Sequence, residues 1–419
     1  MRIIRAGALA GSLRAAAMLA MLVFVSCMSS WMTSADFGLL ALIISLATLA
    51  AGLGSFGQAE MAIRSIAARR ASGDDTGLVE VPNEIAGLVV WISGLIGCVL
   101  ALYLVIEGYS AAIWISTIVL SIALSLMTAL SGAARAADRF VLALFPKDIA
   151  WRVLAIAIVG AGMFLGRNTE AGVVVTIVAL SAVACAVLQL RGLGVRTGSL
   201  FGPPSHILNR PYLTGSATIA ISIFAVVALG TLDVIIVGAL ISPDAAAAYF
   251  PANRLAIIAV FASLPIQMVV EPRLASMLAT EDAHGAQQVA NAATGLQFLM
   301  SLVLGLAVVG GFPVYDALFP TASQETFQVL VILVAGVVLG SMLGLSGSIL
   351  LMSGNQVLFA RTNILCAGLA AGLLLLAAGD GSLTAIACVV AGVELLRKSI
   401  LAIHAYRRTA LLPFTFRSL

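Results

Sequence analysis

Charged residues are scarce in this sequence. Asp, Glu, Lys and Arg make up 10% of its 419 residues, whereas 61% of the residues are hydrophobic. Soluble domains contain about 25% charged and about 45–50% apolar residues. A water-soluble fold has no interior large enough to hide so much apolar side chain, so lipid must cover the excess. The composition therefore excludes a soluble protein and predicts a membrane protein.

Other classes of protein are excluded by what the sequence lacks. Its five cysteines form no close pair, its three histidines are far apart, and neither H-E-x-x-H nor G-x-S-x-G occurs. We therefore expect no disulfide, no metal site, no cofactor and no enzymatic activity. A net charge of +3 with dispersed basic residues gives no indication of nucleic-acid binding. The G-x-G-x-x-G match at Gly52–Gly57 lies in an apolar helix with no preceding strand, where small residues permit close helix packing.

What the sequence has instead is a series of long apolar stretches, each close to the roughly 20 residues that cross a bilayer. Six of them come first, at about 11–33, 37–63, 85–106, 110–133, 148–166 and 172–190. Six more follow, at about 212–240, 246–270, 290–312, 327–350, 357–378 and 382–405. The sequence predicts an all-α polytopic membrane protein of about twelve transmembrane helices.

These stretches divide into two halves of six. We expect an N-terminal six-helix lobe at 1–190 and a C-terminal six-helix lobe at 212–419 that ends in a short basic tail. Between them, residues 191–211 are rich in glycine and include two adjacent prolines, a composition typical of a flexible connection. We interpret this segment as a cytoplasmic linker.

The basic residues indicate the orientation, because short cytoplasmic loops retain Lys and Arg. With both termini in the cytoplasm, 20 of the 22 basic residues fall on the cytoplasmic side. Arg167 alone then lies in a periplasmic loop, and Arg254 lies within a predicted span. The pattern predicts a multi-pass protein of a bacterial inner membrane with both ends inside the cell.

The two halves also resemble each other in sequence. Residues 34–68 align with residues 243–277 without a gap, and the pairs that carry weight are Gln58 with Gln267 and Arg64 with Arg273. Because six spans separate the two copies, both have the same orientation in the membrane. We therefore expect a parallel repeat, an arrangement with which transporters enclose a site near the middle of the membrane.

Two ionisable residues within predicted spans are candidates for function. Asp233 and Arg254 flank a short turn at similar depth, and each costs about 2.5–3.5 kcal/mol at a helix centre. One interpretation is a structural salt bridge; the other is a cavity in which Arg254 binds substrate and Asp233 couples an ion. Arg14, Asn253, Gln58 and Gln267 add polar groups at or near membrane depth, as further substrate-binding candidates or as interfacial residues.

Several segments resemble one family. They are Ser34–Leu42 with its continuation to Arg64, Ala134–Phe140, Asp233–Asp244 with its continuation through Tyr249 to Arg273, and Leu351–Gln356. Together they are similar to the oligosaccharide flippases of the multidrug, oligosaccharidyl-lipid and polysaccharide exporter superfamily. The resemblance implies two lobes around a central cavity, alternating access, and transfer of a lipid-linked oligosaccharide from the cytoplasmic to the periplasmic leaflet.

The resemblance also implies roles and partners. Arg254, with Arg14, would hold the diphosphate of the substrate, and Asp233 would couple transport to an ion gradient. Membrane lipid, a polysaccharide polymerase and the chain-length machinery would be the partners. Two alternatives stay open, namely a drug or organic-cation exporter of the same superfamily and a membrane enzyme that acts on lipid-linked glycans.

Overall fold

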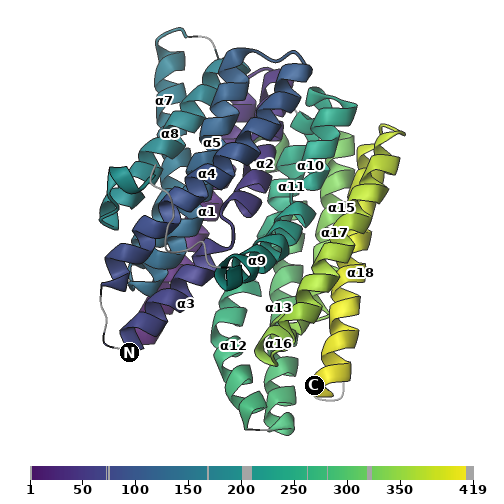
Figure 1. Ribbon diagram of the computed structural model, residues 1–419. Coiled ribbons are helices and arrows are strands. Elements are labelled where there is room, and N and C mark those ends of the chain that lie inside the picture. The colour runs from purple at the N-terminus through teal and green to yellow at the C-terminus, as the bar shows by residue number, and fades with distance from the viewer. Residues whose placement is uncertain are drawn as a thin grey trace. The chain divides into compact units, whose positions relative to one another are not determined.

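The computed structural model describes residues 2–71, 73, 76–167, 169–200, 210–261, 263–280, 282–318 and 323–411 (Figure 1). Within these ranges the regular structure is helical throughout, and no strand occurs. The helices follow from the solvent, because a backbone in lipid must satisfy its own N–H and C=O groups. The prediction of an all-α polytopic membrane protein is confirmed.

The first half of the chain forms six continuous helical segments. They are α1 (Arg2–Trp31), α2 with α3 (Ser34–Gly54 and Gln58–Ala71), α4 (Gly77–Ile106), α5 (Ala111–Ala136), α6 with the π-helical turn η1 and α7 (Phe140–Leu144, Phe145–Ala150 and Trp151–Phe164), and α8 (Ala171–Gly192). A short 3-10 helix, η2 (Thr197–Leu200), follows.

The second half again forms six. They are α9 with α10 and the π-helical turn η3 (Arg210–Leu229, Leu232–Ile236 and Val237–Ile241), α11 with α12 (Pro243–Val260 and Ser263–Ala279), α13 (Ala283–Gly310), α15 with α16 (Gln324–Ser341 and Ser346–Met352), α17 (Gln356–Ala378), and α18 (Leu383–Thr409). A short helix, α14 (Phe312–Leu318), lies between α13 and α15. These twelve segments match the predicted spans one for one.

Nine helices of the described chain are long and apolar enough to cross a membrane by length and composition. The three remaining segments fall short for visible reasons. The fifth is broken by η1 and carries Lys147 and Asp148, and the eighth is divided between α11, which ends at Val260, and α12, which begins at Ser263. The last, α18, carries Arg397 and Lys398 in its middle part. Charge and helix breaks, and not a lack of length, set these three apart.

One predicted boundary is wrong by several residues. The fifth span was expected at 148–166, but the helical segment begins at Phe140. The charges that appeared to mark its start lie inside the helix, where Lys147 Nζ is 2.8 Å from Asp148 Oδ1. An ion pair between neighbours neutralises both groups and lets the helix continue through them.

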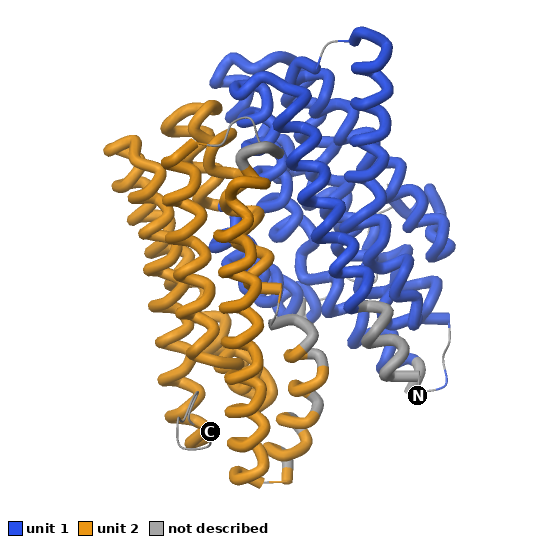
Figure 2. The backbone as a smooth tube through the Cα atoms, turned by 180° about the vertical axis from the view of Figure 1, so that it is seen from behind, with its two compact units in different colours: residues 1–231 blue, residues 232–419 orange. Residues whose placement is uncertain are grey.

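The chain divides into two compact units, residues 1–231 (unit 1) and residues 232–419 (unit 2), shown in Figure 2. Helix α9 belongs to unit 1, whereas the sequence placed residues from 212 onward in the C-terminal lobe. The reason is its packing, because α9 lies against α2 and hydrogen-bonds to the start of α3. Residues 201–209 of the predicted linker lie outside the described residues.

Unit 1 is organised around α5, which packs against α2, α3, α4 and α8. Serines 121 and 125 follow each other at helical spacing, are buried, and donate to carbonyls one turn back in the same helix. Bonded in this way, their side chains are small and satisfied, so neighbouring helices approach closely. Unit 2 has α18 against α15, α16 and α17, with α13 packed on α11, α12 and α15.

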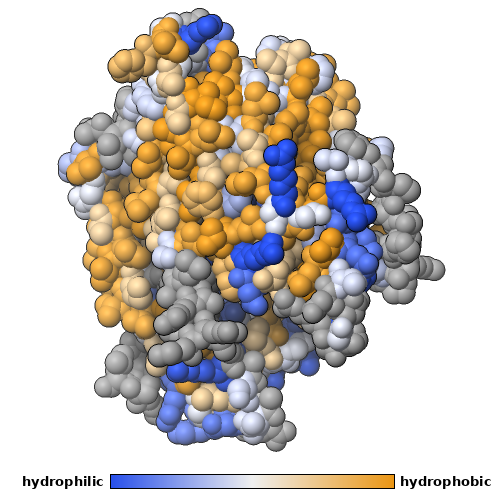
Figure 3. Space-filling view, turned by 90° about the vertical axis from the view of Figure 1, so that its left-hand side faces the viewer, coloured by the Kyte–Doolittle hydropathy of each residue, from blue (hydrophilic) through white to orange (hydrophobic). Residues whose placement is uncertain are grey.

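Large apolar side chains cover much of the surface. Phe164 is 95% exposed, and Ile106 and Leu376 are each 75% exposed. In Figure 3, apolar side chains cover most of the described surface in view, and the hydrophilic ones form separate smaller groups. Such a surface is unfavourable in water and favourable against acyl chains. Lipid therefore takes the place of water around the sides of the protein.

Two wide helical turns interrupt the regular geometry. In η1, Pro146 has no N–H to donate, which favours a changed hydrogen-bond pattern at that turn. In η3, the amide of Ser242 donates to the carbonyl of Val237 at 3.1 Å, five residues back. Such π-helical turns hold one more residue than an α-helical turn and often lie at functional sites. The second one directly follows α10, the short helix that carries Asp233.

Candidate functional site

Asp233 is the centre of a buried polar cluster in unit 2. It lies on α10, is 2% exposed, and accepts hydrogen bonds at Oδ2 from Tyr249 Oη (2.9 Å) and Asn253 Nδ2 (2.7 Å). Tyr249 and Asn253 are four residues apart on α11, so both side chains leave the same face of that helix. Ser242 caps α11 by accepting from the amide of Ala245, which fixes where the helix begins. The cluster is thus built by one tight turn between two helices.

Two oxygens of this cluster are left over. Asp233 Oδ1 and Asn253 Oδ1 are buried and have no hydrogen-bond partner among the described residues. A buried carboxylate oxygen without a partner costs free energy unless a proton or a cation joins it. The cluster therefore presents an acceptor site of the kind that binds a proton or a small hard cation.

Arg254 takes no direct part in it. Its guanidinium carbon lies 4.6 Å from the ring centroid of Phe250, one helical turn back, and its side chain is half-buried. No ion pair within 4 Å joins it to Asp233 among the described residues. The salt-bridge interpretation of the two residues is therefore not what the structure shows, since hydrogen bonds from Tyr249 and Asn253 hold the carboxylate instead.

Gln58 occupies a different place from its sequence counterpart. It starts α3, is fully buried, and lies directly after the turn at Phe56 and Gly57. Its Nε2 donates to Ser216 Oγ (2.7 Å), and its Oε1 accepts from Tyr212 Oη (2.7 Å). Both partners are on α9, so the amide joins α3 to α9 within unit 1.

A glycine makes this contact possible. Gly57 has a φ of +67°, and a Cβ there would lie 2.8 Å from the carbonyl oxygen of Ser216. Any larger residue would be strained by its backbone and would push α9 away. The G-x-G-x-x-G match thus belongs to helix packing, as the sequence indicated.

We expect Tyr212→Phe to lower the free energy of unfolding by about 1–3 kcal/mol, because Gln58 Oε1 loses its donor in a buried place. The measurement is the melting temperature of the purified protein in detergent. Tyr406→Phe is the control, since that side chain is 49% exposed. Equal melting temperatures for the two variants would show that the hydrogen bond contributes nothing.

Arg14 is half-buried on α1 in unit 1, so it belongs to a different unit from Arg254. Within the described chain the predicted site residues thus form one cluster, Asp233 with Asn253, while Gln58 is engaged with α9. Whether Arg14 and Arg254 share a substrate stays a prediction.

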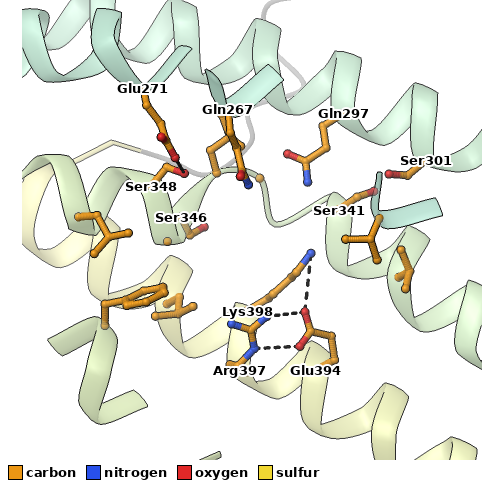
Figure 4. Close-up of a pocket in the computed structure, with 18 residues that line it drawn as sticks. Gln267, Glu271, Gln297, Ser301, Ser341, Ser346, Ser348, Glu394, Arg397 and Lys398 are labelled. Carbon is orange, nitrogen blue, oxygen red and sulfur yellow. Dashed lines mark hydrogen bonds and ion pairs between the residues drawn. The ribbon is translucent and has the colours of Figure 1, made fainter. Parts of the chain in front are cut away.

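Gln267 lies in the wall of a cavity inside unit 2, shown in Figure 4. The cavity has a volume of about 290 Å³, near the lower end of the roughly 300–1,000 Å³ of small-molecule sites. Its polar wall consists of Gln267 and Glu271 of α12, Gln297 and Ser301 of α13, Ser341 of α15, Ser346 and Ser348 of α16, and Glu394, Arg397 and Lys398 of α18. Val260, Val337 and Phe359 are among its apolar residues.

Three of the four charged residues of this cavity lie on one face of α18, where Glu394, Arg397 and Lys398 are spaced by three and four residues, and the fourth is Glu271 of α12. Arg397 donates twice to Glu394, from Nε at 2.8 Å and from Nη2 at 2.6 Å. Lys398 lies 15 residues after Leu383 and 11 before Thr409, or about 22 Å and about 16 Å along the helix. The group is therefore well inside the helix.

The sequence analysis missed this cavity. It counted Arg397 and Lys398 with the cytoplasmic side, although the predicted span 382–405 contains both, and their side chains are only 17% and 22% exposed. The signal was present in the length of the apolar pattern, which continues past both residues to Leu401 and Ile403 before the terminal basic pair. Gln297 and Glu271 were not singled out, although Glu271 lies one helical turn after the candidate Gln267.

Comparisons with known proteins agree with the fold. No protein-family model and no curated protein matches the sequence. Among solved structures, an inward-facing multidrug resistance MATE family transporter of the MOP superfamily is 14% identical, with a TM-score of 0.66 and 94% of each chain covered. An outward-facing one is 13% identical with a TM-score of 0.64, covering 97% of this chain and 95% of its own.

A MATE transporter of Vibrio cholerae is 14% identical, with a TM-score of 0.57, and covers 97% of this chain and 96% of its own. Likeness at this level of identity establishes architecture and not activity. It extends over nearly the whole length of both chains in each case. The chain therefore has the fold of the MATE transporters of the MOP superfamily.

Proposed function

We propose that this chain is a secondary-active exporter that carries an organic solute across the membrane by alternating access. The observation that carries the proposal is the buried Asp233, which keeps one oxygen open inside a membrane-embedded unit. Ionisable groups in such places are rare and mark ion pathways and coupling sites. The fold supports the same conclusion, because the similar transporters are known in inward-facing and outward-facing conformations.

In this proposal Asp233 couples transport to an ion gradient. A proton or a Na⁺ ion that binds between Asp233 and Asn253 would neutralise the carboxylate and satisfy both open oxygens. The adjoining π-helical turn η3 is a place where the helix changes geometry at low cost. Ion binding would thus favour one arrangement of α10 and α11 over another, which is the differential binding that a population shift requires.

For the substrate, the similar proteins favour a drug or another organic solute, since they are described as multidrug resistance transporters. Expression in a bacterial strain without its own drug exporters tests this. We expect lower intracellular accumulation of at least one lipophilic dye, reversed when the ion gradient is collapsed. Unchanged accumulation across a panel of cationic, neutral and anionic dyes would remove drug export as the function.

A second substrate, a lipid-linked oligosaccharide, is favoured by one feature of the structure. Cationic side chains lie inside unit 2 at Arg254, Arg397 and Lys398, and guanidinium and ammonium groups are the natural partners of phosphate. In that case the chain would work in a bacterial inner membrane with both termini in the cytoplasm. The polysaccharide polymerase and the chain-length machinery would be its partners.

Arg254→Ala tests this second candidate. If Arg254 holds the diphosphate, we expect accumulation of the lipid-linked glycan in the cytoplasmic leaflet and a drop in export of roughly 10-fold or more, as for loss of a charge-assisted contact. The measurement is a leaflet-accessibility assay on whole cells with protein levels matched. Normal glycan export at a normal protein level would remove that role from Arg254.

A further inference from the structure

The ammonium group of Lys398 is the least satisfied charge in the cavity of unit 2. Its Nζ lies 3.9 Å from Glu394 Oε1, beyond hydrogen-bond distance, and it has no hydrogen bond to any described residue. Glu394 is already engaged by two donors of Arg397, and Arg397 Nη1 donates to Asn363 Oδ1 at 2.9 Å. Arg397 and Glu394 therefore neutralise each other, and Lys398 is left with three donors and no acceptor.

These donors are directed into the cavity. In Figure 4 the Lys398 side chain extends from α18 toward the space between Gln267, Gln297 and Ser341. The ion pair of Lys398 with Glu394 includes no hydrogen bond, and a charged ammonium without a hydrogen-bonded acceptor is costly inside a membrane-embedded unit. Since the protein supplies no acceptor oxygen at bonding distance, an acceptor from a ligand fits the position.

A second and independent observation comes from the opposite wall. Gln297 is 2% exposed and lines the same cavity, yet its Oε1 has no hydrogen-bond partner among the described residues. A buried amide oxygen without a hydrogen-bond partner is unfavourable, and a hydroxyl or N–H group of a ligand would supply the missing donor. A ligand that satisfies both Lys398 and Gln297 must carry an acceptor and donors together.

The serines of the wall add further acceptors. Ser341 Oγ donates to Val338 O at 2.6 Å, and Ser301 Oγ donates to Ala259 O at 3.0 Å. Because each hydroxyl proton is already used, the remaining capacity of these oxygens is to accept. Glu271, whose Oε1 accepts from Ser348 Oγ at 2.7 Å, is one more acceptor with an oxygen to spare. The wall thus holds one cationic group without a hydrogen-bonded acceptor, Lys398, together with several oxygens that can accept.

We propose that this cavity binds a hydroxylated organic anion, with its carboxylate or phosphate on Lys398 and its hydroxyl groups on Gln297, Ser341 and Glu271. A hydroxyl-rich group supplies several donors at once, which matches the acceptors of the wall. Arg397 already neutralises Glu394 next to Lys398, and Glu271 of α12 is left to accept from hydroxyl groups, so the anionic group of the ligand belongs at Lys398. Only one part of this inference rests on the proposed export function, namely that the bound anion is the transported solute.

The test is calorimetric titration of the purified full-length chain in phosphatidylcholine nanodiscs. Four probes separate the parts of the proposal: glucuronate, glucose without the carboxylate, cyclohexanecarboxylate without the hydroxyls, and tetraphenylphosphonium as a lipophilic cation. We expect glucuronate to bind about 10-fold or more tightly than each of the other three. Equal or tighter binding of tetraphenylphosphonium, or no glucuronate binding, would overturn the proposal.

Variants locate the binding in the cavity. Lys398→Met removes the charge and Gln297→Leu removes the open amide, each with little change of volume, and we expect each to weaken glucuronate binding about 10-fold or more. Arg361→Gln is the control, because this cation of unit 2 is exposed and does not line the cavity. Melting temperatures within a few degrees of wild type confirm folding. If either folded cavity variant bound glucuronate as tightly as wild type, the binding site would not be this cavity.

Two further arms identify the source of the anion. Phosphatidylglycerol has a hydroxylated anionic headgroup, so nanodiscs of this lipid would compete with glucuronate if the cavity holds a membrane lipid. Unchanged affinity there assigns the site to a cargo. Export is measured separately as glucuronate flux in proteoliposomes. Glucuronate binding without flux would support the binding site and contradict the proposed export function. Flux of other solutes without glucuronate binding would contradict the binding site and support the export function.

Discussion

Asp233→Asn is expected to reduce ion-driven transport by roughly 10-fold or more, within the usual range of coupling free energies. Asparagine has nearly the shape of aspartate and keeps an oxygen that accepts from Tyr249 and Asn253, so the helices stay packed. What it loses is the negative charge that a proton or Na⁺ would neutralise. The measurement is solute uptake into proteoliposomes under an imposed pH or Na⁺ gradient.

Asp244→Asn is the matched control for this prediction. Asp244 lies in the first turn of α11, on the same helix as Tyr249 and Asn253, but its side chain is exposed. We expect its uptake to equal that of wild type. Uptake by Asp233→Asn that responds fully to the gradient would show that coupling occurs elsewhere. In that case the buried carboxylate has a structural role only.

Gly132→Ala is expected to have the largest effect on stability. A Cβ at Gly132 would lie 1.9 Å from the carbonyl oxygen and 2.5 Å from the Cα of Ala59, both backbone atoms of α3. A clash with backbone atoms cannot be relieved by a change of side-chain rotamer, so α3 and α5 must move apart. We expect a loss of about 3 kcal/mol or more, at or beyond the upper end for an overpacked core. Thermal unfolding in detergent measures it.

The same substitution in α4 should have the opposite sign. At Gly94 the nearest atom to an added Cβ is Ile122 Cδ1, at 4.0 Å, so alanine meets no obstacle. Replacing a glycine inside a helix by alanine stabilises it by about 0.5–1 kcal/mol. If Gly132→Ala melts at the temperature of Gly94→Ala, the close approach of α3 and α5 does not limit the stability of unit 1.

The helices could be predicted from the sequence because the membrane imposes a simple rule on it. Each crossing needs about 20 apolar residues, and the twelve apolar stretches gave the twelve helical segments. The rule fails where charges neutralise each other inside a helix. Lys147 with Asp148 is such a pair, and the predicted fifth span therefore began at residue 148, whereas the helical segment begins at Phe140.

The candidate site was predictable only in part, for a physical reason. Asp233 could be found because a lone acid in an apolar run is costly, and the following turn brings Asn253 to it. Its hydrogen-bond partner Tyr249 was not identified, since a tyrosine in a helix is usually packing. The polar wall of the cavity in unit 2 comes from five helices, and no pattern within one helix predicts which side chains converge there.

The wide turn η3 has a consequence for the evolution of this chain. A residue added to an α-helix advances everything after it by about 100° and would rotate the far end away from its neighbours. Here the extra residue lies within η3, between Val237 and Ser242. The helix before η3 and the turn after it can therefore pack against the same neighbours as they would without the extra residue. A relative with a regular helix at this point should therefore be shorter by one residue, a gap inside a membrane span where alignments normally allow none.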